Sequence, residues 1–307
     1  MTTENISVSL SEVHRSVTIP KDVGFIKRLL AFGGPAYLVS VGYMDPGNWA
    51  TDIEGGARFG YQLIWVLLMS NLMAVLLQTL SARMGIATGR DLAQACREHY
   101  SKPVSFTLWI LCEIAIASCD LAEVLGTAIG LNLLVGIPLI YGVIITGFDT
   151  ILLLVIQSYG IRKMEAFIIS LVATIGACFA IDVFLAKPIW GEVMTGFAPR
   201  LSSESLYIAI GIIGATVMPH NLYLHSALVQ SRIVEQTEEG KRRACKYNLI
   251  DTGIALNAAF FVNAAILILS ASVFFKSGII VTEIKQAHEL LTPLLGTALA
   301  STLFAVA

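Results

Sequence analysis

Two short segments of this 307-residue chain combine metal-ligating side chains with residues that break helices. Residues 45–48 read Asp-Pro-Gly-Asn and residues 218–221 read Met-Pro-His-Asn, and each segment lies inside a long apolar run. Proline removes an amide donor and glycine loosens the backbone, so neighbouring carbonyls and amides lose their helical partners. In an apolar environment such groups persist where they line a cavity or bind an ion. The two segments are therefore the strongest candidates for a functional site.

The ligand types at the two breaks favour a divalent transition metal. Asp45 and Asn48 are three residues apart, so an unwound turn can direct both side-chain oxygens into one cavity, which suits almost any divalent cation. Met218 adds a soft thioether, which favours manganese, iron, cobalt or cadmium over magnesium and calcium. The carbonyl of Ala215, about one turn before the second break, would supply a fourth ligand. A buried methionine is usually core packing, so the assignment of Met218 rests on its position.

Three carboxylates follow the helical repeat in a third apolar run. Glu113, Asp120 and Glu123 lie within about 80° of each other on a helix, and acids on one face of a membrane helix can relay protons. The alternative is ion pairing with a neighbouring helix, for which Arg232 is the nearest candidate in type and depth. The sequence thus predicts either a proton relay or an ion pair at this acidic face.

Histidine adds a group that titrates near neutral pH. His220 directly follows the second proline, so it can accept a proton or gate the pathway together with Asp45. We interpret His225, five residues further on, as a hydrogen-bonded histidine of the bundle. The assignment of His220 places proton chemistry beside the metal ligands.

The elements that position these residues are membrane helices. The chain is 56% hydrophobic and 14% charged, with a mean hydropathy of +0.75, which excludes an ordinary soluble domain and argues against nucleic acid as a partner. About 20 apolar residues span a bilayer as a helix. Such runs predict an all-α bundle of eight spans, at 30–58, 62–82, 104–131, 138–157, 164–186, 205–231, 248–275 and 290–307.

Basic residues indicate the orientation of the bundle. Fifteen of the 20 Lys and Arg residues fall before the first span or in the connections after spans 2, 4 and 6. Because positive loops resist translocation, this bias predicts a multi-pass protein of the cytoplasmic (inner) membrane with its N-terminus in the cytoplasm. No cleavable signal peptide precedes the first span. Residues 1–28 are expected to form a cytoplasmic tail, with 1–20 disordered.

Matching breaks in spans 1 and 6 predict two repeats of five helices with inverted topology. Residues 29–186 would form the first repeat and 187–307 an incomplete second one, so we expect the sequence to be truncated after the eighth helix. The five cysteines form no C-x-x-C pair and are interpreted as reduced core residues.

The two motifs resemble those of the Nramp metal transporters, in particular the bacterial proton-coupled manganese transporters. The resemblance rests on 45–48 in span 1 and on 214–225 (Gly-Ala-Thr-Val-Met-Pro-His-Asn-Leu-Tyr-Leu-His) in span 6, with 120–123 (Asp-Leu-Ala-Glu) similar to the family's acidic pair. It implies a LeuT-like fold and alternating-access cotransport of protons with Mn²⁺ or Fe²⁺. It also implies metal ligands at Asp45, Asn48, Ala215 and Met218. The proton-linked network that it implies includes Asp45, Asp120, Glu123, His220 and Arg232. No enzyme activity and no cofactor are expected.

Three alternatives remain open at this point. An organic-substrate symporter of the same fold is disfavoured because Asp45 would repel a substrate carboxylate. An intramembrane hydrolase lacks a supporting motif. The third alternative is an inactive or incomplete transporter fragment.

Overall fold

The computed structural model describes residues 9–20 and 23–307, and this part of the chain is almost entirely helical. The helices are α1 (Phe25–Phe32), α2 (Pro35–Ser40), α3 (Pro46–Phe59), α4 (Ile64–Thr88), α5 (Leu92–His99), α6 (Lys102–Val135), α7 (Leu139–Ser158), α8 (Ile161–Ala186), α9 (Trp190–Thr195), α10 (Ser203–Thr216), α11 (Pro219–Leu228), α12 (Glu238–Ser270), α13 (Ile284–Leu295) and α14 (Ala298–Val306). Short 3₁₀ turns η1 (Val41–Met44), η2 (Gly60–Leu63) and η3 (Val229–Ser231) and a π-helical turn η4 (Ala271–Phe275) join some of them.

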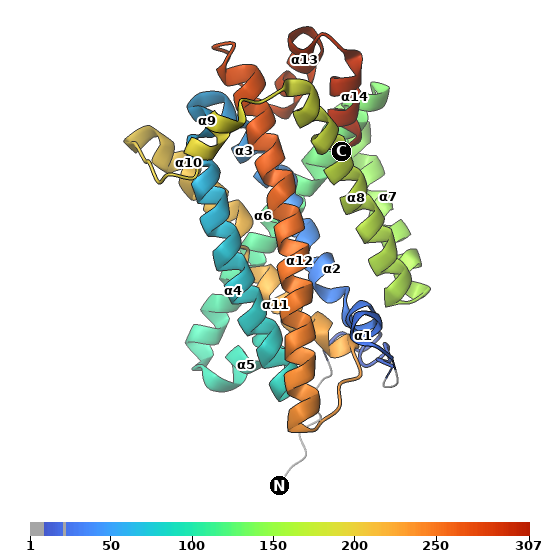
Figure 1. The fold of residues 1–307 in the computed structure, drawn as a ribbon. Helices are drawn as coiled ribbons and strands as arrows, with labels where there is room; N and C mark the ends of the chain where they lie inside the picture. The colour runs from blue at the N-terminus through green and yellow to red at the C-terminus, as the bar shows by residue number, and fades with distance from the viewer. Residues whose placement is uncertain (1–8, 21–22) are drawn as a thin grey trace.

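The bundle is organised around α12, which runs along its length in Figure 1 and packs most extensively on α4 and α3. The main apolar core lies between α3, α4, α10 and α12 and includes Leu67, Ile212 and Leu267, all nearly inaccessible to solvent. Helices α1 and α5 lie at one end of the bundle, and α9 and α13 at the other. We call the two ends of the bundle the α1 end and the α13 end.

The first predicted break is present and has a local cause. The chain runs from α2 through η1 and stops being helical at Asp45, whose φ of −71° and ψ of 164° are extended. Asp45 then caps α3, since its Oδ1 accepts a hydrogen bond from the Asn48 amide at 2.8 Å. Pro46 occupies the first helical position, where its missing amide proton costs nothing. Span 1 is therefore two half-helices that meet at Asp45.

The second predicted break is equally clear. Helix α10 ends at Thr216, and Val217 and Met218 adopt non-helical conformations before Pro219 begins α11. The Thr216 hydroxyl donates a hydrogen bond to the Ile212 carbonyl at 2.7 Å, which gives one carbonyl near the end of α10 a side-chain donor. The Ala215 carbonyl is left to face a partner outside its own helix.

Five helical runs among the described residues are long and apolar enough to cross a membrane: Pro46–Thr88, Leu139–Ser158, Ile161–Ala186, Ser203–Ser231 and Glu238–Phe275. The first of these joins α3, η2 and α4, and so covers parts of two expected spans. The count of eight spans stays a prediction.

The expected eighth span over 290–307 is wrong as a single helix. Gly296, with φ of +70°, ends α13, and Thr297 caps the separate nine-residue α14 through the Leu299 amide. A left-handed residue that glycine adopts without strain stops a helix whatever the hydrophobicity around it. The apolar composition of this region therefore concealed a turn.

The expectation of a disordered tail is also wrong for residues 9–20, whereas residues 1–8 lie outside the described part. Val17 donates to the Ser231 carbonyl at 3.0 Å and accepts from the Ile233 amide at 2.9 Å. Arg15 donates to the Gln230 carbonyl at 3.0 Å, and the side chains of Val13 and Val17 are buried. This part of the tail is therefore attached to the segment that follows α11.

Candidate metal site between two broken helices

Asn48 connects the two breaks. Its Nδ2 donates to Asp45 Oδ1 at 2.6 Å and to the Ala215 carbonyl at 3.0 Å, so one amide nitrogen lies between two oxygens predicted to bind metal. Its Oδ1 accepts from the Thr216 hydroxyl at 3.2 Å and lies 3.5 Å from Asn263 Nδ2. The side chain is inaccessible to solvent. Three of the four predicted ligands are thus in direct contact.

Met218, the fourth predicted ligand, is buried at the start of α11. Its sulfur lies 3.8 Å from Nδ2 of Asn221, and Asn221 lies against Gly42 in η1. In the described part of the chain, the Met218 sulfur makes no hydrogen bond with Asp45 or Asn48. The structure therefore places Met218 at the second break, with its sulfur hydrogen-bonded to Asn221.

Helix α6 packs tightly against the first break. A Cβ added at Gly126 would lie 2.2 Å from Cγ of Pro46, so only glycine allows this approach. The acidic face of α6 reaches the same place through Cys119, whose sulfur lies 3.7 Å from Glu123 Oε1 and 4.0 Å from Asp45 Oδ2. One thiol therefore bridges the span 1 carboxylate and a span 3 carboxylate.

His220 also belongs to this neighbourhood. It lies within electrostatic reach of both Asp45 and Asp120, and its Nδ1 is buried without a hydrogen-bond partner in the described part of the chain. The structure thus brings together Asp45, Asp120, Glu123 and His220 of the predicted proton network.

Two members of that predicted network lie elsewhere. The Glu113 carboxylate accepts a hydrogen bond from Trp109 on its own helix at 2.9 Å. Arg232 pairs with Glu165 of α8 at 2.7 Å and donates to the carbonyls of Phe32 and Gly33, both at 2.8 Å. The suggested pairing of Arg232 with the acids of span 3 is therefore wrong, because a carboxylate on α8 is nearer.

The interpretation of His225 is confirmed. It is fully buried, its Nδ1 lies 3.0 Å from Gln78 Oε1, and Gln78 donates in turn to the Tyr43 hydroxyl at 2.9 Å. All five cysteines are free, but only Cys178 is buried, so the description of the others as core residues is wrong.

Sequence reasoning missed three residues of the site: Thr216, Asn263 and Cys119. Asn263 donates to the Tyr43 carbonyl at 2.8 Å, which η1 leaves without a helical partner. Its only signal in the sequence is an amide in the middle of an apolar run of α12. Cys119 has no such signal, since a lone thiol in an apolar helix resembles packing.

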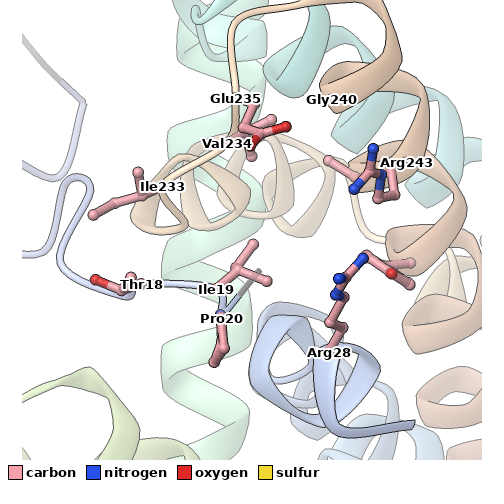
Figure 2. Close-up of a pocket in the computed structure, with 11 residues that line it drawn as sticks. Thr18, Ile19, Pro20, Arg28, Ile233, Val234, Glu235, Gly240 and Arg243 are labelled. Carbon is pink, nitrogen blue, oxygen red and sulfur yellow. The ribbon is translucent and has the colours of Figure 1, made fainter. Parts of the chain in front are cut away.

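No cluster of three or more His, Cys, Asp or Glu side chains suited to a metal occurs in the described residues. The candidate site is of a different kind, since one carboxylate is joined by an amide, a carbonyl and a thioether. A cavity of about 180 Å³ lies away from it at the α1 end, between the N-terminal segment, α1 and α12. Figure 2 shows Arg28 and Arg243 on one side of this cavity and Glu235 above it.

Two pairs of half-helices whose breaks meet at one polar cluster, inside an apolar bundle, define a LeuT-like membrane transporter fold. The chain belongs to the natural resistance-associated macrophage protein-like family, whose family model matches residues 36–307. This is a family of metal-ion transporters and not of enzymes.

Known proteins support this assignment. The chain is 59% identical over 312 residues to a divalent metal cation transporter of Mesorhizobium japonicum, covering 99% of this chain and 68% of that protein. It is 56% identical over 304 residues to a divalent metal cation transporter of Nostoc, covering 97% and 69%. A crystal structure of a mutant manganese transporter of Eremococcus coleocola matches with a TM-score of 0.89 at 39% identity, covering 97% of this chain and 65% of that one. The chain thus spans about two thirds of the length of these relatives.

Proposed function

We propose that the protein carries Mn²⁺ or Fe²⁺ across the cytoplasmic membrane together with protons, by alternating access. The observation that carries this proposal is the contact of Asn48 with both Asp45 and Ala215, because it joins ligands from two broken helices at one point. The names of the relatives, which are a divalent metal cation transporter and a manganese transporter, support the same class of cargo.

Metal binding between the Asp45 and Ala215 oxygens requires the side-chain amide of Asn48 to rotate by half a turn. In the structure its Nδ2 faces the Asp45 and Ala215 oxygens, and a cation between those oxygens would repel an amide nitrogen. A half-turn of the amide would give Oδ1 to the metal and Nδ2 to Thr216. Asn263 would support the turned amide, since its own Oδ1 is buried without a partner among the described residues. Met218 would then complete the set as the soft ligand that discriminates against Mg²⁺ and Ca²⁺.

Proton coupling follows from charge. A divalent ion at Asp45 makes a proton on that carboxylate unfavourable, and the nearby acceptors are His220 and the acidic face of α6. Cys119 lies between Asp45 and Glu123, so it offers a bridging group for the transfer. Metal binding would thereby release a proton toward Asp120 and Glu123.

Alternating access requires the half-helices to move at one end while they stay packed at the other. At the α1 end, Arg232 and Arg162 both donate to the Gly33 carbonyl, and Asp251 accepts from the Gly34 and Ala36 amides. These contacts hold the junction between α1 and α2 closed. The bias of basic residues toward the connections at this end supports its placement in the cytoplasm.

Uptake by the purified chain in liposomes tests the proposal. We expect Mn²⁺ to accumulate when the outside is acidic, and accumulation to fall when a protonophore removes the pH gradient. Mn²⁺ uptake that ignores the gradient would contradict proton coupling, and an absence of both uptake and Mn²⁺ binding would contradict the function as a whole. Asn48→Ala is the matched variant, since it removes the contact between the two breaks.

A further inference from the structure

Asp52 is a buried carboxylate that has no hydrogen-bond partner among the described residues. Asp52 on α3 is inaccessible to solvent, and neither of its carboxylate oxygens has a hydrogen-bond partner in the described part of the chain. No ion pair involving it occurs among the described residues. Burying an ionised carboxylate in this way is strongly unfavourable. The residue therefore needs a ligand, and a proton is the smallest one that satisfies it.

Asp52 lies on the same face of α3 as the metal ligands. It is seven residues after Asp45 and four after Asn48, so the three positions fall within about 60° around the helix. The rise from Asp45 to Asp52 is about 10 Å, directed toward the α13 end of the bundle. Asp52 is thus the next polar group on this face outside the candidate metal site.

The groups that meet α3 one turn beyond Asp52 carry no positive charge. Gly55 and Gly56, one turn further on, face Ile208 and Ile212 of α10 and Leu267 and Ser270 of α12. Ser270 donates its hydroxyl to the Ile53 carbonyl, so it is already engaged. Other elements packed on α3 carry charged or titratable groups, and these include Tyr43 on η1, Tyr61 on η2, Glu204 on α10, Asp251 on α12, Cys119, Asp120 and Glu123 on α6, and Lys285, His288 and Glu289 on α13. Asp45, which acts electrostatically on Asp52, is an acid as well.

We propose that Asp52 is a second proton-binding site of the transport cycle, protonated in the packing seen here and ionised when α3 separates from α10 and α12. Opening this interface would admit water, and the proton would leave the carboxylate oxygen for that water. The resulting charge would stand about 10 Å outside the Asp45 site, where it attracts an approaching divalent cation. Closing the interface would require a proton from the external solution to return to Asp52. This inference rests on the proposed function.

Infrared spectroscopy of the protein in liposomes tests the protonation directly and without transport. Protonated carboxylic acids have a carbonyl stretch that carboxylates lack. At neutral pH we expect Asp52→Asn to lose one such band from the wild-type spectrum, and Asp52→Glu to shift it. A spectrum that is unchanged in this region in Asp52→Asn would overturn the proposal, because Asp52 would then be ionised.

Transport supplies the second test, with Asp182→Asn as the matched control. Asp182 on α8 is likewise fully buried and without a hydrogen-bond partner in the described chain, but it lies on another helix and outside the site. We expect Asp52→Asn to flatten the dependence of the initial Mn²⁺ uptake rate on external pH and to raise KM about two- to fourfold at low ionic strength. Asp182→Asn should leave both quantities unchanged.

The outcomes separate this inference from the proposed function. Wild-type uptake with an unchanged pH profile in Asp52→Asn would overturn the role of Asp52 while the transport function stands. Equal changes in Asp52→Asn and Asp182→Asn would also overturn it, because the effect would then belong to any buried acid of the bundle. If Asp52→Asn does not fold, Asp52→Glu decides the matter, since its band must shift and its pH profile must persist.

Discussion

Two arginines bind the same buried glutamate, and the structure predicts very different consequences of removing them. Arg232 and Arg162 take different oxygens of Glu165, at 2.7 and 3.0 Å. The Arg232 side chain is 0% exposed, whereas that of Arg162 is 42% exposed. We therefore compare the stability of the Arg232→Ala variant with that of the Arg162→Ala variant.

The expected loss in the free energy of unfolding depends on which contacts each truncation removes and which charges it leaves unpaired. Arg232→Ala removes charged hydrogen bonds to Glu165, to two carbonyls and to the Ser231 hydroxyl, all within the bundle. Breaking a buried ion pair costs about 3–5 kcal/mol, and we expect the lower end because Arg162 still holds the other oxygen. Arg162→Ala removes contacts at the exposed C-terminal end of α1, so a cost of about 1 kcal/mol is expected.

Denaturant titration of the protein in detergent measures the free energy of unfolding of each variant. Arg232→Ala should lose about 3 kcal/mol, and the double variant Arg232→Ala/Glu165→Gln should lose less than the sum of its two parts, since no buried charge is left unpaired. Equal losses for Arg232→Ala and Arg162→Ala would refute the reasoning. Additive effects in the double variant would show that the pair is not coupled.

Three further predictions concern the site. Gly126→Ala should destabilise the fold by about 1–3 kcal/mol, because the added Cβ overpacks against Pro46 of the first break. Gly130→Ala on the same helix should stabilise the fold slightly, because a Cβ there meets open space. Thermal unfolding of the two variants measures the difference. Asp120→Asn and Glu123→Gln should slow or uncouple proton movement with little change in Mn²⁺ affinity, and loss of metal binding in either would make α6 a source of ligands. Met218→Ala should still bind Mn²⁺, but it should lose discrimination against Ca²⁺ and Mg²⁺, and its affinity for Cd²⁺ should fall more than its affinity for Mn²⁺. Competition of Mn²⁺ uptake by excess Ca²⁺ or Mg²⁺ measures this change. If the variant resists competition as well as the wild type does, Met218 is a packing residue only.

The features that could be predicted from the sequence depend on local chemistry. Proline and a capping aspartate fix the first break within four residues, and the same is true of the proline at the second break. Because breaks in a membrane bundle persist only where their polar groups find partners, their meeting at Asn48 could also be expected.

The features that could not be predicted depend on contacts between distant parts of the chain. Glu165 is the partner of Arg232 because α8 passes beside the segment after α11, and no spacing in the sequence reports that approach. The attachment of Val17 to residues 231 and 233 is similar, since a short extended segment carries no periodic signal. The prediction of a continuous eighth span was wrong for a local reason. The hydropathy of the region indicated one helix, although a single glycine, Gly296, ends α13 within it.

The central claim is that a divalent metal binds where the two helix breaks meet, and isothermal titration of Mn²⁺ tests it most directly. Asp45→Ala should abolish binding, because it removes the only formal charge among the proposed ligands. The matched control is Glu54→Gln, which neutralises a carboxylate on the same helix that pairs with Arg58 at 2.7 Å and takes no part in the site. We expect wild-type Mn²⁺ affinity in the control and no binding in Asp45→Ala. Unchanged Mn²⁺ affinity in Asp45→Ala would contradict the claim.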